Sequence, residues 1–162
     1  MSSREEVRPA RLRIYSEVER ARRDASPWTI VQGVLAPIQF LVFLASLALV
    51  LRYLLTSDGY LVATWSVVIK TGILYLIMIT GSIWEKVVFG KWLFAPSFFW
   101  EDVVSFVVIF LHSLYLWTLF SPEWDPRSQM FVALLAYAAY ALNAFQFLRK
   151  LRLARREVAV AA

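Results

Sequence analysis

Four long apolar stretches alternate with short polar segments along this chain. Gly33–Leu51 contains no charged residue, and the one charged residue in Tyr60–Trp84 is Lys70. A helix of about 20 apolar residues spans the ~30 Å hydrocarbon layer of a bilayer. The stretches are apolar on every face, whereas the helices of a soluble bundle show polar faces. The pattern therefore predicts an all-α membrane protein whose four transmembrane helices cover about residues 29–52, 60–84, 98–120 and 129–148.

The polar segments divide the chain into three parts. Residues 1–27 are rich in charge and form either an amphipathic surface helix over Arg11–Arg23 or a disordered arm. Ser26, Pro27 and Trp28 are typical of a helix start, with the serine as N-cap. Residues 28–150 form the four-helix transmembrane domain, and residues 151–162 form a basic tail.

The distribution of Lys and Arg predicts the orientation of the spans. Seven lie in the N-terminal arm, two in the middle loop and five after the last span, against Arg52 and Arg127 on the other side. Basic residues favour the cytoplasmic side. The four spans therefore form an antiparallel bundle with the N and C termini in the cytoplasm.

Composition narrows the chemistry further. The chain has no Cys and one His, which excludes disulfides, thiolate metal sites and bis-His haem within one chain. The net charge of +5 comes from residues that flank apolar blocks, which favours lipid headgroups over nucleic acid as the partner. No phosphate-binding loop, nucleophilic triad or dinucleotide fingerprint is present.

Polar residues inside the spans are costly and tend to face the interior of a bundle. At 1.5 Å per residue, Gln39, Tyr75 and His112 reach a similar depth near the midplane. Asn143 and Gln146 share one side of the last span, nearer the cytoplasmic face. His112 can also be a simple interhelical hydrogen-bonding residue, and Lys70 can snorkel to the outer face.

Carboxyl groups concentrate where the second and third spans meet the middle loop. Glu85, Glu101 and Asp102 lie there among the aromatic residues Trp84, Phe99 and Trp100. Burial among aromatic rings raises the pKa of a carboxyl group, so that one member can act as an acid while a neighbour acts as a base. The alternative is that these residues are interface charges and helix caps only.

Several segments resemble the 3-vinyl bacteriochlorophyllide hydratases, over roughly residues 17–155. The segments that carry this resemblance are Glu19–Thr29, Val34–Phe43, Gly81–Gly90, Leu93–Asp102 and Asn143–Leu148. The strings Trp84-Glu85-Lys86 and Phe98-Phe99-Trp100-Glu101-Asp102 within them are distinctive. The resemblance implies that water is added across the C3 vinyl group of a chlorophyllide, giving a 3-(1-hydroxyethyl) group in bacteriochlorophyll synthesis.

This activity suggests roles for the polar residues. The reaction needs an acid, a base and a bound water but no cofactor, and magnesium enters only as part of the pigment. We expect Glu85, Glu101 or Asp102 to supply the acid and the base, and His112 to ligate the pigment magnesium or shuttle a proton. The expected pigment-binding residues are Trp84, Phe99, Trp100, Gln39, Tyr75, Asn143 and Gln146.

The expected partners are the chlorophyllide, the lipid bilayer and other pigment-biosynthesis enzymes, with no nucleic acid. The expected location is the bacterial inner membrane, cytoplasmic or intracytoplasmic. One alternative function is a non-enzymatic membrane subunit that binds a pigment or a quinone. A small transporter or scaffold is another, although transporters usually show internal repeats and none is evident here.

Overall fold

A computed structural model describes residues 14–161, with side chains for residues 14–156. Its five helices are α1 (Glu17–Ala25), α2 (Pro27–Thr56), α3 (Tyr60–Phe89), α4 (Phe99–Thr118) and α5 (Pro126–Ala161). The last four are each long and apolar enough to cross a membrane. The all-helical class and the four membrane-spanning candidates predicted from the sequence are therefore confirmed.

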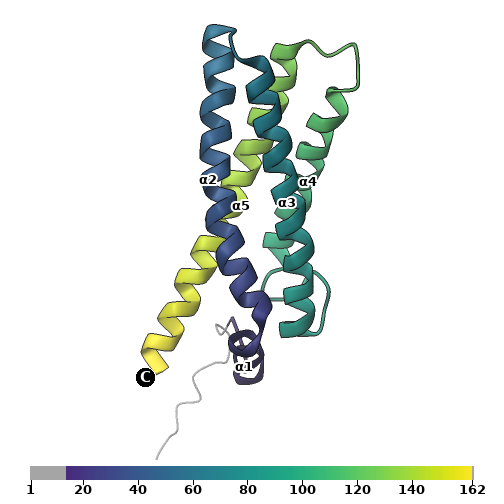
Figure 1. The fold of residues 1–162 in the computed structure, drawn as a ribbon. Helices are drawn as coiled ribbons and strands as arrows, with labels where there is room; N and C mark the ends of the chain where they lie inside the picture. The colour runs from purple at the N-terminus through teal and green to yellow at the C-terminus, as the bar shows by residue number, and fades with distance from the viewer. Residues whose placement is uncertain (1–13, 162) are drawn as a thin grey trace, which may run out of the picture.

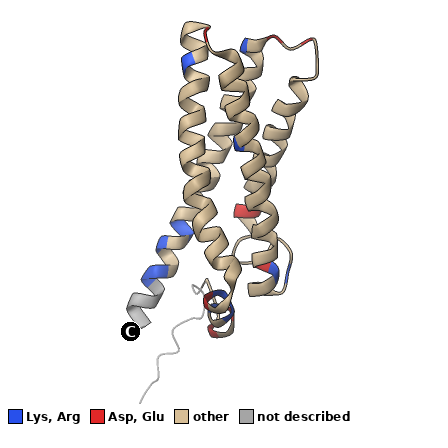
Figure 2. Ribbon diagram, viewed as in Figure 1, with Lys and Arg blue, Asp and Glu red and all other residues tan. Residues whose placement is uncertain are grey.

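The four long helices pack as two pairs, α2 along α3 and α4 along α5, and α5 also contacts α2 (Figure 1). The α2–α3 and α4–α5 connections lie at one end of the molecule (Figure 1). At the other end lie α1, the α3–α4 connection and the last turns of α5. Basic residues gather on the α1 and α5 segments there (Figure 2), and we call residues 14–28, 85–102 and 146–156 the basic end.

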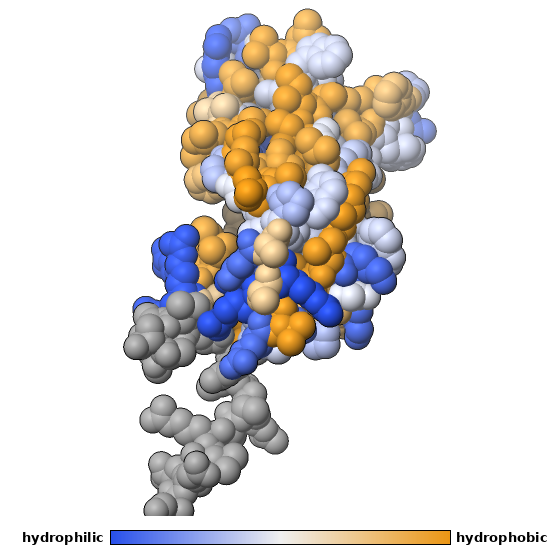
Figure 3. All heavy atoms as spheres, turned by 60° about the horizontal axis from the view of Figure 1, so that its bottom comes forward, coloured by the Kyte–Doolittle hydropathy of each residue, from blue (hydrophilic) through white to orange (hydrophobic). Residues whose placement is uncertain are grey.

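The interior and the outer surface are both largely apolar. Buried Val50, Val67, Val108 and Tyr137 belong to the main core between the helices. Many large apolar side chains point outwards as well, because helices with no polar face suit a hydrocarbon environment. Viewed towards the basic end, hydrophilic residues gather near α1 and apolar residues cover the body beyond it (Figure 3).

The start of α2 agrees with the sequence prediction. Ser26 is the N-cap of α2, and its hydroxyl accepts a hydrogen bond from the backbone N–H of Trp28 at 3.3 Å. Pro27 occupies the first turn, where its missing N–H costs nothing. Pro37 lies inside α2, as expected from its position within the first apolar stretch.

The surface helix begins later than predicted. Of the expected range Arg11–Arg23, residues 11–13 lie outside the described residues, and α1 starts at Glu17. Ser16 and Glu19 form a capping box there, with each side chain accepting a hydrogen bond from the other residue's backbone N–H. Val18 of this helix is 61% exposed, whereas Tyr15 just before the helix is buried.

The last helix continues past the predicted end of the fourth span at residue 148. α5 runs on to Ala161, so much of the predicted basic tail is helical. The segment consists largely of Leu, Ala and Arg, which are strong helix formers, so no residue interrupts the helix where the apolar stretch ends.

Candidate functional site

Aromatic rings fill the space where α1, α3 and the start of α4 meet. Tyr15 stacks on Phe89 with ring centroids 5.7 Å apart, and Trp84 meets Phe98 edge to face at 5.6 Å. The Trp84 indole N–H donates to the Thr29 hydroxyl at 3.0 Å. Trp84, predicted as a wall for the pigment, thus packs inside this aromatic cluster.

Two buried carboxyl groups hold the connection between α3 and α4. The Glu85 carboxylate accepts a hydrogen bond from the backbone N–H of Ala95 at 3.2 Å. The Asp102 carboxylate accepts one from the backbone N–H of Phe94 at 2.7 Å. These bonds fix the connection, although Phe94 has a φ of 59°, in the left-handed region that a bulky residue rarely adopts.

The same two carboxyl groups lie close together, because they accept hydrogen bonds from the adjacent residues Phe94 and Ala95. Glu85 is 5% exposed and Asp102 is 3% exposed, so little water can screen them from each other. Two carboxylates buried side by side repel each other when both are ionised, which favours a proton on one of them. The Glu85–Asp102 pair is therefore suited to hold one proton.

Glu101 lies beside this pair but has different partners. One carboxylate oxygen lies 3.6 Å from the Lys150 ammonium group and has no hydrogen bond within the described part of the chain. Lys150 also donates to the backbone carbonyl of Ser97. Lys150 thus places a positive charge next to the Glu101 carboxyl group.

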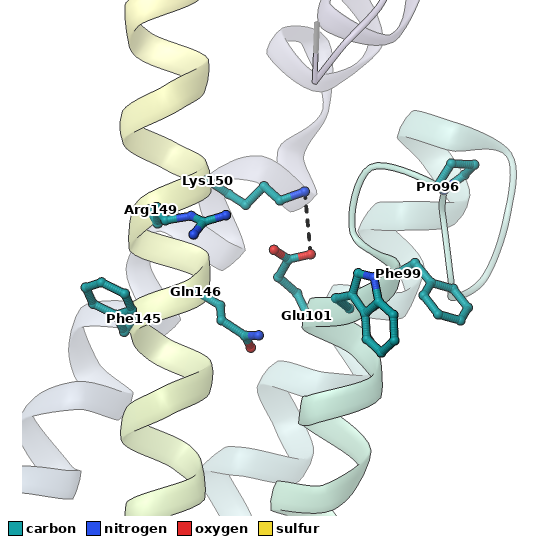
Figure 4. Close-up of a pocket in the computed structure, with 8 residues that line it drawn as sticks. Pro96, Phe99, Glu101, Phe145, Gln146, Arg149 and Lys150 are labelled. Atoms are coloured by element: carbon teal, nitrogen blue, oxygen red, sulfur yellow. Dashed lines mark ion pairs between the residues drawn. The ribbon is translucent and has the colours of Figure 1, made fainter. Parts of the chain in front are cut away.

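A pocket of about 310 Å³ opens between the start of α4 and the end of α5. Gln146 and Lys150 extend from α5 towards Glu101 on α4 (Figure 4). The side-chain oxygen of Gln146 is buried and accepts no hydrogen bond from the residues that are described. The pocket is lined by Pro96, Phe99, Trp100, Glu101, Phe145, Gln146, Arg149 and Lys150.

The pocket brings together four of the residues predicted for the site: Phe99, Trp100, Glu101 and Gln146. Phe99 is 42% exposed and Trp100 is 68% exposed, so their rings are available to a flat ligand. Glu85 and Asp102 do not line the pocket, although Asp102 directly follows Glu101 in α4.

The remaining predicted residues are engaged or enclosed elsewhere. Asn143 donates to the Glu101 backbone carbonyl at 2.9 Å, and Tyr75 hydrogen-bonds the Ser113 hydroxyl at 2.7 Å. Gln39 is 2% exposed and His112 is fully buried. His112 Nδ1 lies 2.8 Å from the Val108 carbonyl, while Nε2 has no partner among the described residues. Its role as a magnesium ligand stays a prediction.

Four pocket residues were missed from the sequence: Pro96, Phe145, Arg149 and Lys150. The two basic residues were interpreted only as orientation signals. Asn143, Gln146 and Lys150 recur at i, i+3 and i+7, the spacing of one helix face, and this signal could have found Lys150.

Fold and site together define an integral membrane protein with a cluster of buried carboxyl groups beside an aromatic pocket. The sequence model of the family described as 2-vinyl bacteriochlorophyllide hydratase (BCHF) matches residues 15–153. The chain belongs to this family. This is the family that the sequence resemblance indicated. Its description numbers the vinyl group 2, whereas the name used above numbers it 3.

Two relatives carry the same name. The 2-vinyl bacteriochlorophyllide hydratase of Rhodobacter capsulatus is 62% identical over 151 residues, covering 93% of this chain and 88% of the relative. That of Cereibacter sphaeroides is 62% identical over 150 residues, covering 92% of each chain. No solved structure is significantly similar to this chain.

Proposed function

We propose that this protein is a hydratase that adds water to the vinyl group of a bacteriochlorophyllide, giving a 1-hydroxyethyl group during bacteriochlorophyll synthesis. Relatives with 62% identity bear the name of this activity. One observation carries the assignment to this site. Glu101 lines an aromatic pocket, and one of its carboxylate oxygens is buried with no hydrogen-bond partner among residues 14–156.

The aromatic residues at the pocket suit a flat, conjugated pigment. Phe99 and Trp100 offer exposed ring faces, and such faces stack on planar ligands. The pocket volume of about 310 Å³ admits one edge of a macrocycle, while the remainder lies against the lipid-facing surface. We propose that the vinyl-bearing edge enters.

The reaction then needs one proton delivered and one removed. The proton held by the Glu85–Asp102 pair passes through the neighbouring Glu101 carboxyl group, which lines the pocket, to the terminal vinyl carbon. The positive charge develops on the inner carbon, where the conjugated ring delocalises it. The oxygen of a water molecule forms a bond to that inner carbon and loses its proton to Glu101. A proton transfer from Glu101 to its neighbour Asp102 restores the starting state.

Two further side chains support this arrangement. Lys150, 3.6 Å from Glu101, forms an ion pair with the carboxyl group that we propose as the base. The unpartnered oxygen of Gln146 accepts a hydrogen bond from the attacking water and holds it beside the base. These steps use no added cofactor, and magnesium belongs to the pigment substrate.

We further propose that α2 to α5 form an antiparallel bundle in the bacterial inner membrane, with residues 28–150 as the membrane domain. Both termini then face the cytoplasm, because Lys and Arg gather at the basic end (Figure 2). Pigment and lipid would meet at this end. Other pigment-biosynthesis enzymes are proposed partners, because the pigment must pass between membrane-bound steps.

The test is a product assay with purified protein, a vinyl chlorophyllide and no added cofactor. Hydration removes the vinyl group from conjugation and shifts the pigment absorption. We expect Glu101→Gln to lower kcat by at least about 100-fold, the usual contribution of a general base. The matched control is Glu123→Gln, because Glu123 is exposed in the α4–α5 connection.

The assay separates the competing functions. If wild-type protein binds the pigment but leaves its absorption unchanged, the non-enzymatic pigment-binding role replaces the hydratase. If Glu101→Gln hydrates as fast as Glu123→Gln, Glu101 is not the base and the proposed proton transfers are wrong.

A further inference from the structure

The pocket carries one positive charge that the proposed chemistry does not use. Arg149 and Lys150 both line it, and Glu101 is its one acidic lining residue. Lys150 is engaged by Glu101 at 3.6 Å and by the Ser97 carbonyl. No ion pair or hydrogen bond to Arg149 is found within residues 14–156, so its charge is not neutralised by the described part of the protein.

Arg149 is placed to meet a ligand in the pocket. It follows Gln146 by three residues on α5 and so shares a side of the helix with it. Its guanidinium group extends from α5 on the side of Glu101 and α4 (Figure 4). A ligand that places its reacting edge beside Glu101 and Gln146 therefore has a free guanidinium within the same pocket.

The chemistry of the substrate supplies a matching group. A chlorophyllide differs from the corresponding chlorophyll in that its propionic side chain is not esterified, so it carries one carboxylate. Arginine binds a carboxylate through two parallel, charge-assisted hydrogen bonds.

We propose that Arg149 binds the free propionate carboxylate of the pigment and makes the enzyme select unesterified pigment over its ester. This inference rests on the proposed hydratase function. An ester has no charge and offers the guanidinium only weak acceptors, so the discrimination is a loss of binding rather than of chemistry.

The experiment compares a vinyl chlorophyllide with its methyl ester on wild-type protein and on Arg149→Gln. We expect wild type to show a KM about 10-fold lower for the free acid than for the ester. Arg149→Gln should raise KM for the free acid to the value for the ester, with kcat changed by less than about twofold. Arg149→Lys keeps the charge but loses the planar guanidinium group. Its KM for the free acid should lie between those of wild type and Arg149→Gln.

Arg152→Gln is the matched control, because Arg152 is exposed on the same helix and does not line the pocket. It should keep the wild-type preference for the free acid. Equal KM values for acid and ester on wild type would overturn the inference. So would an equal rise in both KM values for Arg149→Gln, because that result indicates general pocket or lipid-headgroup binding by Arg149.

Failure of the proposed function gives a separate result. If wild type hydrates neither pigment, the hydratase assignment is wrong, and pigment binding can still be followed by quenching of tryptophan fluorescence, since Trp100 lines the pocket. A preference of wild type for the free acid that Arg149→Gln abolishes would then support the carboxylate site alone. Equal binding of acid and ester would contradict it.

Discussion

Asn143 connects the candidate base to the rest of the bundle. It is 8% exposed, and its amide donates to the Glu101 backbone carbonyl at 2.9 Å and to the Ser105 hydroxyl at 3.1 Å. These bonds cross from α5 to α4 at the turn that presents Glu101 to the pocket. A side chain that contacts only the backbone of Glu101 can therefore fix the position of its carboxylate.

We expect Asn143→Leu to destabilise the protein by about 1–3 kcal/mol, because the substitution leaves buried polar partners unpaired. Thermal unfolding in detergent measures this loss. Leu142→Met, on the exposed neighbouring position, should change stability by less than about 0.5 kcal/mol. An unchanged midpoint for Asn143→Leu would show that these hydrogen bonds do not hold α4 to α5.

At the scale of residues, the sequence predicted which groups gather but not which way they face. Glu85, Glu101 and Asp102 were expected at one place because two spans and one loop converge there. Whether Glu101 or Asp102 faces the pocket depends on the rotation of α4, and adjacent residues on a helix point about 100° apart. Their different surroundings could not be obtained from spacing alone.

At the scale of elements, the ends of the helices show which signals were decisive. Ser26 and Pro27 gave the start of α2 correctly, because capping chemistry is local. The helix α5 continues beyond the predicted end of the fourth span, because loss of hydrophobicity ends a membrane span and does not end a helix. Phe98 meets the Tyr15 ring at a tilt and the Trp84 ring edge to face. These contacts join separate elements, and no local pattern contains that information.

Asp125 starts α5 outside the membrane-spanning segments. Its carboxylate accepts hydrogen bonds from the backbone N–H groups of Arg127 at 2.9 Å and Ser128 at 3.1 Å. These bonds, with that from the Ser128 hydroxyl, hold the pKa of Asp125 below its ordinary value of 3.8. The folded protein therefore prefers the ionised carboxylate.

A lowered pKa fixes the sign of the pH effect. The stabilisation is complete above the unfolded-state pKa and is lost as the pH falls through the lower folded-state pKa. Asp125→Asn removes the titrating group but keeps an N-cap oxygen. We expect wild type to lose its stability advantage over Asp125→Asn below a pH of about 3.8, as measured by hydrogen exchange in the first turn of α5. A difference that persists unchanged below that range would contradict this assignment.

At the scale of the whole molecule, charge is divided between the two ends. The basic end holds the carboxyl cluster and the pocket, whereas the opposite end carries a few charges of both signs (Figure 2): Arg52, Asp58, Glu123, Asp125 and Arg127. Between them, Gln39, Lys70 and His112 have buried polar atoms without partners in residues 14–156. Lys70 lies 3.7 Å from the ring centre of Tyr140 and so does not snorkel outwards in this structure.

The orientation can be tested with single cysteines, because the natural chain contains none. Lys91→Cys and Ser57→Cys place a thiol at exposed positions of the two opposite ends. In closed membrane vesicles of known sidedness, a membrane-impermeant maleimide should label Lys91→Cys from the cytoplasmic face and Ser57→Cys from the other. The reverse labelling would show that the proposed orientation is inverted, and labelling of both from one face would exclude the proposed topology.

Ser26 forms the junction between α1 and α2. Its backbone ends α1 through a hydrogen bond to the Arg23 carbonyl at 3.2 Å, and its hydroxyl begins α2. The Thr29 hydroxyl donates to the same carbonyl at 2.6 Å and accepts from Trp84 of α3. Ser26 alone separates the two helices. If α1 lies flat on a lipid surface, its direction therefore also sets the tilt of α2. In the orientation proposed above, this junction would therefore also fix how far the pocket lies from the hydrocarbon layer.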